Sequence, residues 1–325
     1  MFRLAHLSDP HLGPLPEPEL LQLLSKRILG YVNWRRNRNK AMGGDYLAAL
    51  IEDMLAEVPD HIALTGDLVN IALPLEIEAA KVWLDAVAPP DLMSLVPGNH
   101  DAYVPGALRS AFKAWRPYMT GDHPAEPDSR NSIKAHFPYL RRRGQLALIG
   151  VSTARASAPG LATGRIGVPQ TRRLQDMLEA TGQEGLFRVV MIHHPPFKGA
   201  TRWHKRLEDA SRLRAAVKRS GAELVLHGHT HIDSLTSIEG PHGPVPVIGV
   251  PSASHAPGGS KPGARYNLFS IAREDGIWRC TMQERGFAKA GEGISAIAER
   301  KSRFRQGRRA AFRLPANLRP LPGRH

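Results

Sequence analysis

The sequence is poor in cysteine and has no long apolar segment. Its 325 residues contain one cysteine, Cys280, which excludes an internal disulfide framework and any site built from several thiolates; a reducing compartment fits best. No apolar run approaches the roughly 20 residues of a membrane-spanning helix, and the first residues lack the apolar core of a secretory signal. We therefore expect a cytoplasmic protein that is at most peripheral at the inner face of the membrane.

Acidic residues are missing or scarce in two segments of this basic chain. Residues 26–40 contain six basic residues and no acidic one, and residues 299–325 contain nine basic residues and one acidic one. These charges of +6 and +8 add up to the net charge of +14, so the rest of the chain is neutral. We interpret the positive charge as a property of two appendages and not of the main body.

Short apolar runs alternate with helical patterns through most of the chain. Strands are predicted at residues 4–7, 61–64, 92–96, 146–151, 187–192 and 224–226, and helices at 46–57, 75–88, 170–180 and 207–219. This alternation is typical of an α/β protein with buried strands. Four more strands, at 234–238, 245–250, 267–272 and 277–282, indicate an antiparallel part that closes the same core.

The composition divides the chain into one body and two basic appendages. We assign residues 1–285 to a single domain that carries a basic insertion at 17–44, and residues 286–325 to a flexible tail with one short helix near 294–305. If residues 19–40 are helical, most of their apolar side chains fall on one half of the helix. Such a basic amphipathic helix suits an anionic membrane surface. Packing on the body or in a dimer is an equal alternative.

The basic tail has two interpretations. It could bind lipid headgroups or nucleic acid through its arginines, or it could be a solvated terminus, which we favour. The sequence argues against a nucleic-acid partner, because the tail has no RNA-recognition signature and only two aromatic residues, Phe304 and Phe312.

Five short polar motifs occur in order, each directly after a predicted strand. They are Asp9-Pro10-His11, Gly66-Asp67, Gly98-Asn99-His100-Asp101, His193-His194-Pro195 and Gly228-His229-Thr230-His231. In open α/β sheets, ligands bind beyond the carboxyl ends of the strands, so we expect the motifs to converge on one edge. Carboxylates, an amide oxygen and imidazoles are ligands for divalent cations. If seven of these groups bind metal, they are too many for one tetrahedral zinc and suit two cations with a shared ligand.

The ordered motifs resemble those of the calcineurin-like metallophosphoesterases, over about residues 1–272. The resemblance implies an α/β fold, a four-layer αββα sandwich of two mixed β-sheets flanked by helices. It implies two divalent cations, Mn²⁺, Fe²⁺ or Fe³⁺, or Zn²⁺. The implied ligands of the first cation are Asp9, His11, Asp67 and His231, and those of the second are Asp67, Asn99, His193 and His229. Asp67 would bridge the cations, and His194 is the alternative to His193.

The same resemblance gives His100 a catalytic role. Its counterpart contacts the scissile phosphate and can protonate the leaving group, and a protonated imidazole suits a site for a phosphate anion. The alternative is a histidine that only hydrogen-bonds a neighbouring loop. We expect Asp101 to orient the His100 ring.

Within the family, the motifs most resemble those of bacterial class III cyclic nucleotide phosphodiesterases and their glycerophosphodiesterase relatives. This implies in-line hydrolysis of a phosphodiester by a bridging hydroxide. One alternative is a membrane-surface hydrolase of a lipid-linked phosphodiester or pyrophosphate, similar in kind to the UDP-diacylglucosamine pyrophosphohydrolases. A second is a metal-bound scaffold without activity. Trp203 and His204 could line the substrate pocket or begin the next helix, and the oligomeric state stays open.

Overall fold

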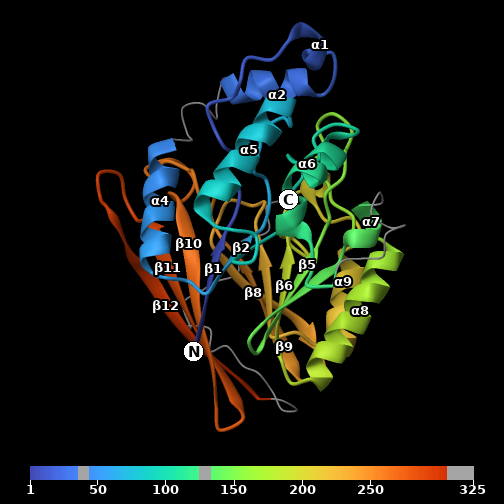
Figure 1. Ribbon diagram of the computed structural model, residues 1–325, viewed down its shortest axis with the longest axis vertical. Helices are drawn as coiled ribbons and strands as arrows, with labels where there is room; N and C mark the ends of the chain where they lie inside the picture. Colours follow the sequence, from blue (N-terminus) through green and yellow to red (C-terminus); the bar gives the residue numbers. More distant parts are fainter. Residues whose placement is uncertain (36–43, 124–132, 306–325) are drawn as a thin grey trace.

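Two six-stranded β-sheets, packed face to face, form the centre of the molecule (Figure 1). The computed structural model describes residues 1–35, 44–123 and 133–305. The first sheet contains, in spatial order, β12 (Ile294–Arg305), β11 (Ile277–Phe287), β10 (Arg265–Glu274), β1 (Phe2–Leu7), β2 (His61–Leu64) and β3 (Met93–Leu95). The second contains β4 (Tyr139–Arg143), β5 (Leu146–Val151), β6 (Phe187–Ile192), β7 (Leu224–His227), β9 (Gly243–Gly249) and β8 (Ser234–Gly240).

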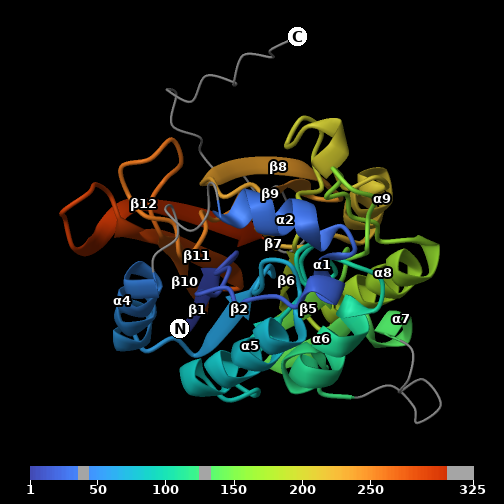
Figure 2. The same ribbon diagram turned by 90° about the horizontal axis from the view of Figure 1, so that it is seen from above.

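Helices cover the outer faces of both sheets. The helices α4 (Gly44–Ala56) and α5 (Pro74–Val87) lie on the first sheet, and α8 (Val168–Gln183) and α9 (Ala210–Ser220) lie on the second (Figure 2). The shorter helices are α6 (Ala107–Trp115), α7 (Ile133–His136) and the 3₁₀ turns η2 (Arg116–Met119) and η4 (Trp203–Lys205). The predicted four-layer αββα sandwich of two mixed sheets is therefore confirmed.

The burial of the strands explains why they could be recognised. Every residue of β2, β5, β6 and β7 is buried, as expected for parallel strands that are covered on both faces. In β11, by contrast, buried and partly exposed residues alternate, because an antiparallel strand near the edge buries one face only. One large apolar cluster lies between the sheets and reaches under α4 and α5, and a second fills the space under α8 and α9.

Strand direction brings the polar motifs to one edge. In the first sheet β1, β2 and β3 run parallel, and in the second β5, β6, β7 and β9 run parallel. The carboxyl ends of parallel strands meet at the same edge of a sheet, so the loops after β1, β2 and β3 lie together. The loops after β6 and β7 reach the same region from the second sheet, since the His193 ring donates to the carbonyl of Thr65 and His229 N–H donates to Asp9 Oδ2.

One predicted element is wrong. Residues 294–305, expected as a short helix, form the edge strand β12, which pairs antiparallel with β11 along its whole length, from Ile277 opposite Arg305 to Phe287 opposite Ile294. Sheet hydrogen bonds outweigh the helix propensity of the Ala, Glu and Arg residues here, since propensity is a weak preference that tertiary context overrides. The first sheet therefore continues beyond residue 285, while residues 306–325 of the expected tail lie outside the described part.

The basic insertion forms two short helices, α1 (Leu20–Leu23) and α2 (Arg27–Asn33), instead of one amphipathic helix. The first two basic side chains of the insertion point toward the body: Arg27 donates to the carbonyls of Ile71 and Ala72, and Lys26 donates to that of Leu161. Residues 36–43 of the insertion lie outside the described part. None of the helices that the structure describes is long and apolar enough to cross a membrane.

Trp278 provides a test of the packing between the sheets. It lies on β11, is 2% exposed and contacts the ring of Phe187 on β6, with ring centroids 5.4 Å apart. We expect Trp278→Ala to lower the free energy of unfolding by about 3–5 kcal/mol, since it leaves a large cavity. The matched control is Trp203→Ala, because Trp203 is 68% exposed and should change stability by only about 0.5 kcal/mol. Urea unfolding of both variants measures the difference, and equal losses would contradict the packing described.

Candidate metal centre

The loops after β1 and β7 form the first cluster of ligand groups. Asp9 and His11 follow β1, and His231 follows β7; all three are buried. Asp9 Oδ1 lies 3.2 Å from His231 Nε2 and 3.9 Å from His11 Nε2, and the two imidazole nitrogens are 3.3 Å apart. One carboxylate and two imidazoles therefore point at one small volume.

The loops after β2, β3, β6 and β7 form the second cluster. Asp67 Oδ2 lies 3.3 Å from His193 Nε2, which is 3.2 Å from the amide oxygen of Asn99. The His229 ring lies beside that of His193, with centroids 5.1 Å apart, and Asp67, His193 and His229 can each offer a ligand atom to one ion. The two clusters adjoin, because His11 and Asp67 also form a group of possible ligands with His100.

The spacing of these atoms fits divalent cations. Ligand atoms bound to one cation at about 2.0–2.2 Å are themselves roughly 3–3.5 Å apart in tetrahedral or octahedral geometry, which is the separation of most pairs in both clusters. In addition, Asp9 Oδ1 is buried and accepts no hydrogen bond of normal geometry. A buried carboxylate oxygen without a donor is costly unless a positive ion faces it.

Hydrogen bonds on the far side of each ring fix which nitrogen can face a metal. The Nδ1–H groups of His193 and His11 donate to the carbonyls of Thr65 and Val69, at 2.6 and 3.1 Å. This leaves Nε2 of both rings for the clusters. In His229, Nε2–H donates to the carbonyl of Lys205 at 2.8 Å, so Nδ1 is its ligand atom. Backbone carbonyls behind the rings are the usual support for metal-binding histidines.

His194, the alternative to His193, is engaged elsewhere. Its Nδ1 accepts from the Thr153 hydroxyl at 2.8 Å, and its Nε2–H faces the carbonyl of Ala162 at 3.2 Å. Burial, and then the positive charge of His193, lower the pKa of His194 to about 3. Its ring is therefore a neutral support that packs against His229, and His193 is the residue directed at the cluster.

The ionised carboxylates of the centre attract positive charge. Burial alone would raise the pKa of Asp67, but His193 and His100 hold it well below its usual value. Likewise, burial opposes a proton on His193, but the charges of Asp67 and Asp9 raise its pKa to about 9. The carboxylates thus stay ionised and attract cations, whether protons on imidazoles or metal ions.

The backbone at the ligands is unusual. Five of the eight non-glycine residues with positive φ in the described part are predicted ligands: Asp9 at 53°, His11 at 40°, Asp67 at 55°, His229 at 69° and His231 at 56°. Aspartate and histidine tolerate this region better than most residues, yet each such conformation costs about 1–3 kcal/mol and is concentrated at functional sites. The loops are therefore shaped for the direction of these side chains.

Two motif glycines allow the loops to touch. A Cβ on Gly98 would overlap the Asp67 carboxylate and its backbone nitrogen, and a Cβ on Gly228 would overlap the Ser8 hydroxyl and the Asp9 carboxylate. A residue with a side chain could not allow this close approach of the loops.

Comparison with known proteins decides the family. The family model described as calcineurin-like phosphoesterase matches residues 2–233, which include all five motifs. The chain belongs to this family. No curated protein sequence matches that of this calcineurin-like phosphoesterase.

Solved structures support the same fold. A dimetal phosphatase from Danio rerio is 11% identical, with a TM-score of 0.58, and the match covers 91% of this chain and 98% of that one. A purple acid phosphatase from yellow lupin seeds is 16% identical, with a TM-score of 0.55 over 92% of this chain. The match spans about half of the lupin enzyme, 53% of its length. Identities this low show the fold alone.

In this calcineurin-like phosphoesterase, Asp101 contributes differently from our expectation. Its buried carboxylate accepts backbone N–H groups of Asp67, Leu68, Val69 and Gly98, at 2.8–3.3 Å. None of these four bonds involves the His100 ring. Burial, and then the charge of Asp67, raise the pKa of Asp101 to about 7. Asp101 therefore joins the loop after β2 to the loop after β3 and so positions Asp67 relative to Asn99.

The surroundings of His100 include residues that sequence reasoning missed. Its Nδ1–H donates to the carbonyl of Asn70, its ring meets the His11 ring edge to face at 4.8 Å, and Tyr103 stacks on it at 5.5 Å. The ammonium group of Lys26 lies 4.8 Å from the centre of the Tyr103 ring. The spacing of Tyr103, three residues after His100, could have suggested the stacking of these two rings. The contact of Lys26 could not be predicted, since its position depends on the fold of the insertion.

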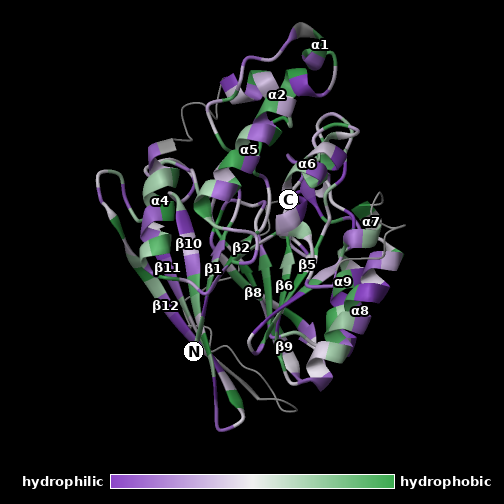
Figure 3. Ribbon diagram, viewed as in Figure 1, coloured by the Kyte–Doolittle hydropathy of each residue, from purple (hydrophilic) through white to green (hydrophobic). Residues whose placement is uncertain are grey.

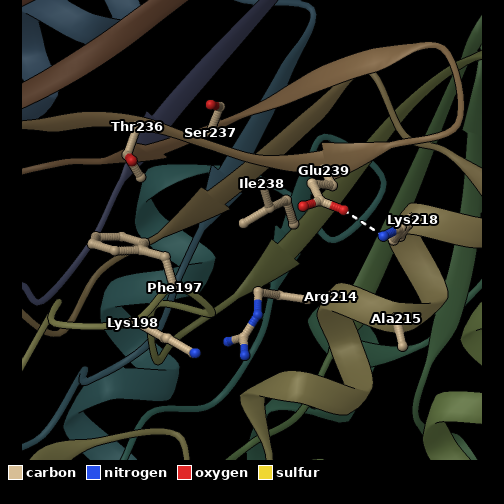
Figure 4. A pocket seen from close by; sticks show the side chains of 9 residues that line it. All are labelled: Phe197, Lys198, Arg214, Ala215, Lys218, Thr236, Ser237, Ile238 and Glu239. Atoms are coloured by element: carbon tan, nitrogen blue, oxygen red, sulfur yellow. Dashed lines mark ion pairs between the residues drawn. The ribbon is translucent and has the colours of Figure 1, made fainter.

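A pocket behind the His193 loop lies apart from the metal ligands. It has a volume of about 540 Å³ between α9 and β8, and none of the seven predicted ligands lines it (Figure 4). Figure 4 shows Lys198 and Arg214 directed toward the same space, beside the ion pair of Lys218 and Glu239 at 2.6 Å. Arg214 also donates to the carbonyl of Pro196 at 2.8 Å, so this wall fixes the loop that begins with His193.

The choice between His193 and His194 can be tested with matched variants. We expect His193→Gln to weaken Mn²⁺ binding by at least about 10–100-fold, the range for losing even a supporting group of a metal site. His194→Gln should change the affinity much less, since both ring nitrogens of His194 contact protein groups. Titration calorimetry of the two variants, with circular dichroism to verify folding, measures this. The reverse order of affinities would assign the ligand to His194.

Proposed function

We propose that this chain is a phosphodiesterase that works with two divalent cations, held by the two clusters and bridged by Asp67. The observation that carries the proposal is that buried Asp67 belongs to two adjoining groups of possible ligands, one with His11 and His100 and one with His193 and His229. The donors are carboxylates, an amide oxygen and imidazoles, which suit Mn²⁺, iron or Zn²⁺. The name of the Danio rerio relative, a dimetal phosphatase, supports two cations and a phosphoester substrate.

The residues of the chain divide the work. Asp9, His11 and His231 would hold one cation, Asn99, His193 and His229 the other, and Asp67 both. When bound, two such cations supply a hydroxide for in-line attack on phosphorus and neutralise the charge that develops there. The supporting carbonyls of Thr65, Val69 and Lys205 keep the imidazoles in the tautomer that can act as ligand.

His100 is the group that can assist the leaving oxygen. Its Nδ1–H is held by the Asn70 carbonyl, so Nε2 is the atom that would transfer a proton to the departing alkoxide. The stacking of Tyr103 and the edge contact with His11 keep the ring in one orientation.

The proposed preference for diesters rests on the three motifs around Asp9, Asn99 and His229, which resemble those of class III cyclic nucleotide phosphodiesterases and their glycerophosphodiesterase relatives. The complete ligand set speaks against a scaffold without activity.

Hydrolysis of aryl esters tests the proposal. With saturating Mn²⁺ we expect the wild type to hydrolyse bis(p-nitrophenyl) phosphate with a higher kcat/KM than p-nitrophenyl phosphate. Asp67→Asn should reduce kcat by at least about 100-fold, more than a supporting residue typically does. The control is Asp122→Asn, since Asp122 pairs with Arg143 at a partly exposed position. Undiminished turnover of Asp67→Asn would reject the bridging role, and a preference for the monoester would reject the diesterase assignment.

The role of His100 predicts a dependence on the leaving group. Nitrophenolate leaves without a proton, whereas an alkoxide needs one, so His100→Asn should slow an alkyl diester more than an aryl diester by about 10²–10⁴-fold, the usual size of general acid catalysis. The measurement is kcat for bis(p-nitrophenyl) phosphate and for glycerophosphocholine. An equal loss on both substrates would leave His100 a role in binding but not in proton transfer.

A further inference from the structure

The two helices of the insertion expose an aliphatic surface. Leu21 and Leu24 are 78% and 80% exposed, and Ile28, Leu29 and Val32 are 40–55% exposed. The insertion packs on the body through α2, where Tyr31 and the following residue Trp34 contact a small apolar cluster. Figure 3 shows hydrophobic and hydrophilic residues side by side on α1 and α2. Neighbouring exposed aliphatic side chains of this kind mark a surface that a partner covers.

A second exposed apolar group lies on η4. Trp203 is 68% exposed, and its exposed neighbours Arg202, Lys205 and Arg206 are basic. The loop of residues 157–162 connects η4 to the insertion: Lys26 donates to the carbonyls of Ser157 and Leu161, and the next residue, Ala162, donates its N–H to the carbonyl of His204. The aliphatic surface and Trp203 therefore flank one loop. We call the exposed residues between Leu21 and Arg35 and between Arg202 and Arg206 the rim.

The rim adjoins the metal centre. On one side Lys26 lies over Tyr103, which stacks on His100. On the other side the carbonyl of Lys205 accepts from the ring of His229. Figure 2 looks down on this end of the molecule, where α1 and α2 are nearest to the viewer. A partner on the rim would thus stand beside the ligand groups.

The charge of the rim indicates what the partner is. Arg35 is exposed at the end of α2, and residues 198–206 contain four Lys or Arg residues and no acidic one. Exposed leucines, a tryptophan and surrounding basic residues are the composition of segments that lie in the interface of an anionic bilayer. Basic residues near such a surface add attraction that salt weakens. Nucleic acid would leave the leucines exposed.

We propose that the rim docks on an anionic lipid bilayer and that the substrate is an amphiphilic phosphoester whose headgroup lies at that surface. Leu21, Leu24 and Trp203 would enter the acyl boundary, and Arg35, Arg202 and Arg206 would meet the lipid phosphates. The metal centre would then face the headgroup layer. The docking stands on the exposed surface alone, and the substrate class rests also on the proposed phosphodiesterase function.

Co-sedimentation of the full-length, Mn²⁺-loaded protein with vesicles tests the docking. One set of vesicles contains phosphatidylcholine alone, and the other contains phosphatidylcholine mixed with phosphatidylglycerol. The wild type should bind the mixed vesicles, and added salt should weaken the binding. Leu21→Asp combined with Leu24→Asp should lower the partition coefficient on the order of 100-fold, and Trp203→Ala about tenfold, as expected for apolar side chains that no longer leave water.

The matched control is Val82→Asp, since Val82 on α5 is 69% exposed and lies outside the rim; it should bind like the wild type. All four proteins should hydrolyse bis(p-nitrophenyl) phosphate equally, which separates a failure of docking from a failure of the proposed function. A wild type that stays in solution with the mixed vesicles, or a Leu21/Leu24 variant that binds like the wild type, overturns the proposal. The proposal is also overturned if the wild type does not bind vesicles and forms a dimer in sedimentation velocity that the Leu21/Leu24 substitutions dissociate. In that case a second copy of the chain would cover the rim.

Discussion

Two buried carboxylates impose the main constraint on this protein. Asp9 and Asp67 lie at the ends of neighbouring parallel strands, β1 and β2, and both are within 2% of full burial. All the ion pairs that the structure gives them are with histidine rings. A buried charge without a counter-charge costs several kcal/mol. The imidazoles around them, the strained loops that aim those imidazoles and the second layer of carbonyls are consistent with one requirement, a stable place for cations.

This requirement also explains the division of labour among the acidic residues. Asp9 and Asp67 offer oxygens to the clusters, whereas Asp101, equally buried, uses both of its oxygens on backbone N–H groups. Glu76 does the same for Asn70, Ile71 and Leu73. The loop that carries Asp67 is thus held by carboxylates on both sides. Its shape is determined by the protein, and the cations would meet a prepared site.

Much of the fold and of the site could be predicted because both follow local rules. Buried parallel strands such as β5 and β6 are largely apolar runs, and the ends of β1 and β6 are marked by the motifs that begin with Asp9 and His193. The rule that strand ends share an edge then brings distant residues together, and the structure places all seven predicted ligands there.

The remainder depends on long-range contacts that no local pattern contains. Helix propensity favoured a helix at 294–305, but the open edge of β11 made it a strand. The adjacency of Asp101 to His100 suggested that one orients the other, whereas the turn directs the Asp101 carboxylate back to the loop after β2. Lys26 and Arg27 were assigned to a basic appendage, yet both bind carbonyls of the body. In each case the partner is either distant in the sequence or a backbone group. Backbone groups are the same in every residue, so the sequence does not indicate which of them a side chain will bind.

The contacts at Gly98 and Gly228 have a consequence for comparing family members. Each lies against a carboxylate of the centre, Asp67 or Asp9, with no room for even a methyl group. A relative could therefore retain all seven ligand residues and still hold its metals badly, if alanine replaced either glycine. When active and inactive family members are sorted by sequence, residues without any side chain deserve the same weight as the aspartates and histidines.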